Sequence, residues 1–215
     1  MKIYVNGVGR AGKRHNAAFT LIEMIGVLAV IAILASMLIP RVFEAINSAR
    51  VNSTAVACDT IKTAAADHFG KYGQFDLLNG TTIYQQGGGN ITNYDIAILM
   101  PEGLLDKPFS AKIAGADVNP NSIIQLVRVT GSNNGGPGGT GYSLDGFGTN
   151  SIANATFVLE AVIKHVSQAD AKDLNDRIDG TALGSTPTTG TGDNLGRVEY
   201  GNTFPTDVYV YLTHR

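Results

Sequence analysis

The sequence predicts an α+β protein in which one long N-terminal helix is followed by a head that contains a small β-sheet. Three observations support this fold class. Residues 19–39 form an apolar run, residues 41–69 contain neither proline nor glycine, and β-branched segments with glycine-rich connections occupy the second half. A chain of 215 residues with 44% hydrophobic side chains can bury one core.

The apolar run from Phe19 to Ile39 is long enough to cross a membrane. Its 21 residues include a single charge, Glu23. At about 1.5 Å per residue the run spans roughly 32 Å as a helix, close to the thickness of a bilayer core. A cleaved secretory signal fits poorly, because its apolar region has only about 7–15 residues. We therefore expect a transmembrane helix over residues 19–39.

The distribution of charge also points to a membrane segment. The net charge is −2 and the pI about 6.0, which lacks the basic footprint of a nucleic-acid-binding protein. No acidic residue precedes Phe19, and the rest of the chain holds 12 basic and 18 acidic side chains. The basic residues of this leading segment are Lys2, Arg10, Lys13 and Arg14. A basic start before an apolar run is typical of a topogenic segment.

The same leading segment contains a glycine pattern, Gly7-x-Gly9-x-x-Gly12, with the spacing of a dinucleotide-binding fingerprint. That fingerprint works only inside a strand–helix–strand unit that is followed by an acidic residue about 20 positions later. Between Gly12 and Pro40 there is no second strand, and the only acid, Glu23, comes too early. The sequence therefore disfavours a soluble nucleotide-binding protein.

Glu23 is the informative residue of the apolar run. A carboxylate in the bilayer core costs about 2.5–3.5 kcal/mol on insertion scales, so it is usually paired or functional. Alternatively, Glu23 lies only about 6 Å inside the run and reaches the interface. The residues alone leave both interpretations open.

The string Ala18-Phe19-Thr20-Leu21-Ile22-Glu23 resembles the processing site of type IV prepilins and type II secretion pseudopilins. The resemblance implies that residues 1–18 are a cytoplasmic leader, which a membrane aspartyl peptidase removes before it methylates the amine of Phe19. It also implies that Glu23 pairs with the terminal amine of a neighbouring subunit during assembly. The family usually has glycine before the cut, whereas this chain has Ala18.

The resemblance further implies a pilin-like fold, in which a long helix over residues 19–70 packs on a small antiparallel sheet in a head of residues 71–215. The expected partners are further copies in a helical filament, the prepilin peptidase and an inner-membrane assembly platform. The subunit would cross the bacterial inner membrane once, with a periplasmic head, before it joins a filament in the periplasm or on the cell surface. A surface pilus and a secretion pseudopilus are not distinguished.

Within the long helix, Pro40 predicts a kink, because proline removes one backbone hydrogen bond and clashes with the preceding turn. Beyond it, Gly70 is the expected C-cap. The expected buried stripe, at steps of three or four, consists of Val42, Ile46, Ala49, Ser53, Val56, Thr60 and Ala64.

The head should contain several strands and one short helix. A helix is expected from Ser167, which opens a capping-box pattern, to Asp179. The glycine-rich stretches 131–149 and 181–195 are expected to be exposed loops. The expected strands are Ser122–Thr130, Ala155–Val166, Arg197–Tyr200 and Asp207–Thr213, the last with alternating buried valines.

No enzyme motif is present, so neither catalysis nor a cofactor is expected. The only cysteine, Cys58, cannot form an intrachain disulfide. The histidines, none at metal-ligand spacing, are His15, His68, His165 and His214. An alternative function remains: a membrane-anchored periplasmic binding protein or enzyme that uses the helix as a simple tether.

Calcium is the one metal to consider, because some pseudopilins hold it in the C-terminal part of the head. The acidic candidates are Asp170, Asp173, Asp176 and Asp179. Their spacing of three on a helix makes them drift around its axis, unlike the ligands of an EF-hand loop. We therefore expect a solvated helix face with a capping aspartate.

Overall fold

The computed structural model describes residues 20–78, 81–82, 90–115, 121–130, 133–146, 151–152, 155–183 and 192–215. The chain divides into two compact units, Met1–Glu44 and Ala45–Arg215. A single helix, α1 (Leu21–Tyr72), runs through both, so the predicted long N-terminal helix is confirmed.

The end of α1 differs from the prediction at Gly70. The helix continues through that glycine to Tyr72, and Gly73 adopts a φ of 71°. The Gly73 N–H donates to the Phe69 carbonyl at 2.7 Å. A left-handed residue just beyond the last turn is a common way for a helix to end, and glycine adopts that conformation without steric cost. The helix therefore ends just before Gly73 and not at Gly70.

The buried face of α1 also differs from the predicted stripe. Of the predicted residues only Ala64 is buried, and Val56 is 56% exposed. Both sets of residues follow steps of three or four, and the chain offers small or apolar side chains on both faces, so spacing alone does not choose between them. The buried residues are Val51, Thr54, Ala55, Cys58, Ile61, Ala64, Ala65 and His68.

The head is built on a five-stranded antiparallel sheet with the order β3-β4-β5-β7-β6. A separate two-stranded hairpin precedes it. The hairpin strands are β1 (Leu77–Leu78) and β2 (Thr81–Thr82), and the sheet strands are β3 (Ile91–Thr92), β4 (Ser122–Arg128), β5 (Phe157–Val166), β6 (Val198–Tyr200) and β7 (Thr206–His214). The four predicted strands are thus confirmed within two residues at each end.

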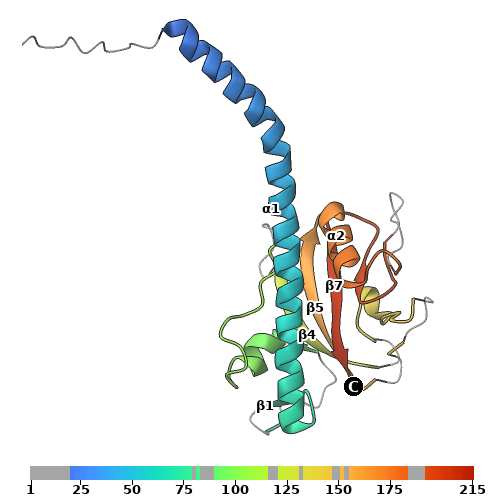
Figure 1. The fold of residues 1–215 in the computed structure, drawn as a ribbon. Coiled ribbons are helices and arrows are strands. Elements are labelled where there is room, and N and C mark those ends of the chain that lie inside the picture. Colours follow the sequence, from blue (N-terminus) through green and yellow to red (C-terminus); the bar gives the residue numbers. More distant parts are fainter. Residues whose placement is uncertain are drawn as a thin grey trace, which may run out of the picture. The chain divides into compact units, whose positions relative to one another are not determined.

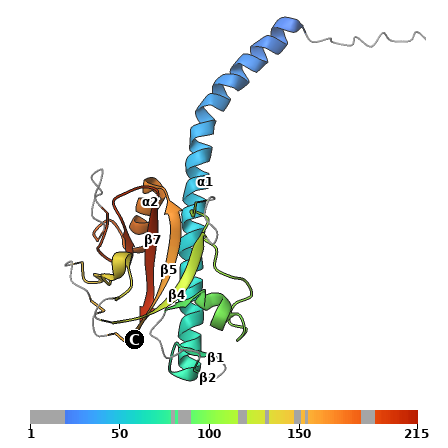
Figure 2. The same ribbon diagram turned by 180° about the vertical axis from the view of Figure 1, so that it is seen from behind.

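One face of the sheet packs on the part of α1 that belongs to the second unit. Figures 1 and 2 show this part of the helix running along β4, β5 and β7. The predicted alternation of β7 is confirmed, since Val208, Val210 and Leu212 are buried and face this core. Burial of large aliphatic side chains contributes roughly 1.5–3 kcal/mol each, so this layer is the main source of stability in the head.

The short helix α2 (Gln168–Ile178) begins as predicted. Ser167 accepts a hydrogen bond from the Asp170 N–H at 3.2 Å, and its hydroxyl donates to the Asp170 carboxylate at 2.9 Å. Two short helical turns complete the described elements of the head, η1 (Asp95–Leu99) and η2 (Pro137–Gly139).

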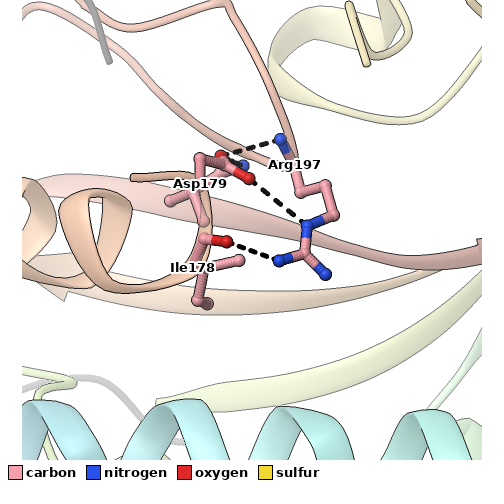
Figure 3. Close-up of polar contacts among 4 residues, drawn as sticks. Ile178, Asp179 and Arg197 are labelled. Carbon is pink, nitrogen blue, oxygen red and sulfur yellow. Dashed lines mark hydrogen bonds and ion pairs between the residues drawn. The ribbon is translucent and has the colours of Figure 1, made fainter. Parts of the chain in front are cut away.

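The carboxylate of Asp179 connects the end of α2 to the beginning of β6 through hydrogen bonds (Figure 3). Asp179 accepts hydrogen bonds from the backbone N–H groups of Arg197 and Val198, both at 2.8 Å. The Arg197 guanidinium reaches the same carboxylate at 3.3 Å and also donates to the Ile178 carbonyl. Burial raises the pKa of Asp179, and these donors oppose that rise.

The described part of the glycine-rich segment after β4 is partly buried, unlike the predicted exposed loop. This part, residues 133–146, lies on the other face of the sheet and buries Gly135, Gly136, Tyr142 and Ser143. Its backbone and Tyr142 donate to carboxylates on that face, which require such partners once buried. The prediction of exposure is wrong for these residues, because glycine also allows the backbone to approach buried carboxylates closely.

Candidate processing and membrane segment

Glu23 forms a reciprocal cap at the beginning of α1. The Thr20 N–H and the Thr20 hydroxyl both donate to Glu23 Oε2, at 2.8 and 2.9 Å, and the Glu23 N–H donates to Thr20 Oγ1 at 3.3 Å. This Thr-x-x-Glu arrangement is a capping box, and a carboxylate in the first turn also complements the helix dipole. Sequence reasoning overlooked this role of Thr20, although the spacing is visible in the chain.

The polar side chains of residues 20–39 all have local partners. Besides Thr20 and Glu23, the only other polar side chain is Ser36, whose hydroxyl donates to the Ile33 carbonyl at 2.8 Å. In a lipid environment, polar groups need such partners within the segment, because lipid tails provide none. The segment is therefore chemically suited to lipid at every polar position.

The apolar side chains of this segment are exposed in the subunit. Leu21 and Ile22 are 77% and 78% exposed, and none of the most apolar 18-residue window of the helix is buried. By length and composition, this part of α1 can cross a membrane. An apolar surface of this extent requires lipid or the helices of other molecules to cover it.

The structure does not test the predictions made for Ala18, Phe19 and Pro40. Ala18 and Phe19 lie outside the described residues, so the cleavage site and the partner of Glu23 in assembly stay predictions. Pro40 lies inside α1, and its ring nitrogen cannot donate to the Ser36 carbonyl one turn earlier. The kink at this residue also stays a prediction.

The four candidate calcium ligands serve other contacts or face solvent. Asp170 accepts a hydrogen bond from the hydroxyl of Ser167, the N-cap of α2. Asp176 pairs with Lys172 and Asp179 binds Arg197, whereas Asp173 is exposed. Among the described residues, no group of three or more His, Cys, Asp or Glu side chains is arranged to hold a metal ion. The described part of the head thus offers no ligand cluster for calcium.

His68 and Cys58 are packing residues of α1. The His68 Nδ1 lies 2.7 Å from Glu102 Oε2, and both side chains are fully buried. The edge of the His68 ring faces Tyr94, with 6.2 Å between ring centroids. Burial raises the pKa of the Cys58 thiol to about 12, which leaves it unreactive. His15 lies outside the described residues.

The chain was compared with known protein families. A family model described as the prokaryotic N-terminal methylation motif matches residues 13–39. This motif is the prepilin-type signal of type IV pilins and pseudopilins, and it covers the basic residues next to the apolar run, Glu23 and the apolar run itself. Searches of curated proteins and of solved structures find no match.

Proposed function

We propose that this chain, which carries the prepilin-type methylation motif, is a structural subunit that polymerises through its N-terminal helix into a type IV pilus-like or pseudopilus filament. The single observation that carries the proposal is the match of this motif to residues 13–39. The exposed apolar surface of α1 supports it, because such a surface needs lipid before assembly and other helices afterwards.

The mechanism is structural and involves no catalysis by the subunit. A prepilin peptidase removes residues 1–18 and methylates the amine of Phe19. The apolar half of α1 holds the subunit in the inner membrane with its head in the periplasm. An assembly platform then moves the subunit into the filament, where contacts with neighbouring helices replace contacts with lipid. The capping box fixes the Glu23 carboxylate in the first turn, close to the new amino terminus.

The proposal is tested by the amino terminus of the mature protein. The full chain is expressed in cells that contain a prepilin peptidase, extracted from membranes, and analysed by intact mass and N-terminal sequencing. We expect a protein that starts at N-methyl-Phe19. The Ala18→Gly variant, which has the residue usual in the family, is the matched control for efficient cleavage.

A mature protein that keeps Met1 in the presence of the peptidase would contradict the proposal. If it is also monomeric in detergent, the helix is a simple tether and the head performs the function, as in a membrane-anchored binding protein or enzyme.

A further inference from the structure

Two carboxylates are buried on the face of the sheet opposite α1, on the two strands that flank β7. Glu160 on β5 and Glu199 on β6 are each 1% exposed. Glu160 pairs with Tyr211 of β7, and Glu199 pairs with Tyr209 of the same strand. Since Tyr209 and Tyr211 are two residues apart, both acids point to the same face of the sheet.

Residues 133–146, here called the flap, close over these acids. The Gly136 N–H and the Tyr142 hydroxyl both donate to Glu160 Oε2 at 2.7 Å. The Ser143 N–H donates to Glu199 Oε1 at 3.2 Å. The flap is therefore attached to the sheet through both carboxylates, and their protonation bears directly on its closure.

The backbone of the flap approaches both acids closely at two glycines. Gly135 and Gly136 have φ values of 78° and 71°, which favour glycine. A Cβ atom at Gly135 would lie 3.0 Å from Glu160 Oε2, and one at Gly136 would lie 3.1 Å from Glu199 Oε2. The backbone of the flap is therefore packed directly against both carboxylates.

The donors around the two acids are unequal. Glu160 accepts three hydrogen bonds, because Gln125 Nε2 donates to its other oxygen at 2.5 Å. Within the described part of the chain, Glu199 accepts one. A buried carboxylate needs several donors to remain ionised, so burial with a single donor favours the protonated form of Glu199.

The surroundings of Glu199 agree with this assignment. Burial is the largest cause that raises the pKa of Glu199 to about 8; the hydrogen bond from the Ser143 N–H opposes the rise, and the neighbouring acids add to it. A groove beside the flap, lined by Pro137, Thr140 and Glu199 among others, provides a path for proton exchange. The titratable groups around Glu199 are Glu160 on β5, Asp193, Asp179, Tyr142 on the flap and Tyr209 on β7.

We propose that the flap is a pH-gated cover of the head, which stays closed while Glu199 carries a proton and loosens as Glu199 loses it. Opening exposes Glu199 to water, where its pKa returns toward the ordinary 4.5. Between pH 4.5 and about 8 the open state therefore releases a proton that the closed state keeps. Opening is favoured as pH rises through this window, by up to about tenfold per pH unit, and levels off above it. The proposal concerns the second unit alone and does not rest on filament assembly.

Hydrogen–deuterium exchange of the full chain in detergent tests the proposal. Exchange is measured from pH 5 to 9 and corrected for the intrinsic pH dependence of amide exchange. We expect protection of peptides within residues 133–146 to fall by up to about tenfold per pH unit until about pH 8 and then to stay constant. Peptides from β5 should show no such change.

The Glu199→Gln variant keeps the shape of the side chain but cannot ionise, so its flap should stay protected at every pH. Asp173→Asn removes an exposed carboxylate of α2 and should retain the wild-type profile. A wild-type flap with constant protection would overturn the proposal, and so would a Glu199→Gln flap that keeps the wild-type pH dependence. Loss of protection in the β5 peptides would reveal a variant that fails to fold. In that case the wild-type profile alone still tests whether flap protection depends on pH.

Discussion

At the scale of single residues, Glu23 has a capping role in the structure and a second role in the proposed assembly, and substitutions can separate the two. Its carboxylate accepts two hydrogen bonds from Thr20, which caps the helix, and its charge is free to attract a cation from another molecule. Capping needs only an oxygen acceptor, whereas pairing with an amine in lipid needs the negative charge. Two substitutions at this residue therefore give different information.

We predict that Glu23→Ala and Glu23→Gln are both inserted and processed but both assemble poorly. Glutamine retains an acceptor oxygen for Thr20 and lacks the charge, so it is the matched control for capping. The measurement is the yield of sheared filaments relative to the membrane pool of processed subunit. Normal filaments from Glu23→Gln would mean that capping alone matters, and normal filaments from Glu23→Ala would remove Glu23 from assembly altogether.

At the scale of elements, the junction between α2 and β6 depends on a close approach of the backbone to Asp179. Gly196 has a φ of 83°, and a Cβ atom there would lie 2.5 Å from Asp179 Oδ2. Gly180, just after α2, has a similar φ of 77° but no atom within 4 Å of its Cβ position. The two glycines thus separate backbone strain from steric overlap.

We predict that Gly180→Ala lowers the free energy of unfolding by about 1–2 kcal/mol, the cost of a left-handed non-glycine residue. Gly196→Ala should cost about 2–5 kcal/mol, because displacement of Asp179 adds to the same strain. Urea unfolding of the full chain in detergent, followed by tyrosine near-ultraviolet circular dichroism, measures both, since the chain has eight tyrosines and no tryptophan. Equal losses for the two variants would show that the Asp179 contact contributes nothing.

Some elements of the fold could be predicted from the sequence and others could not. The strands and α2 were predictable because alternation and capping are local patterns, as Val208 to Leu212 and Ser167 illustrate. The buried face of α1 could not be predicted, because two of its faces carry small or apolar side chains. Only packing against the sheet determines which of the two faces is buried. The flap was missed for a related reason: Glu160 and Glu199 lie far from it in sequence, and their need for donors is a tertiary effect.

The candidate processing and membrane segment also has features that the sequence predicts and features that it does not. The apolar run and Glu23 were visible in the sequence because membrane length and an isolated charge are one-dimensional features. The Thr20 cap was also visible as a spacing but was not recognised. The proposed partner of Glu23 in assembly is an amine of another molecule, which one chain cannot show, so only the family resemblance indicates it.

At the scale of the whole molecule, Cys58 provides a reporter of head unfolding. It is the only cysteine, it is 2% exposed, and it lies in the core between α1 and the sheet. Burial, with a smaller contribution from Asp59, raises the pKa of the thiol from 9.0 to about 12. At pH 8 the folded head therefore contains about a thousandfold less thiolate than the unfolded chain, and that thiolate is also shielded from reagents. The raised pKa means that the folded head keeps a proton that the unfolded chain loses between pH 9 and about 12, so stability falls as pH rises through that window.

We predict that iodoacetamide at pH 8 alkylates Cys58 at least about a thousandfold more slowly in the native protein than in the urea-unfolded chain. Intact mass gives the rate directly, because one cysteine produces one mass increment. Since the reaction requires unfolding of the core, the rate should rise with urea, and Gly196→Ala should accelerate it more than Gly180→Ala does. Rapid alkylation that is independent of urea would mean that α1 separates from the sheet locally, without cooperative unfolding of the head.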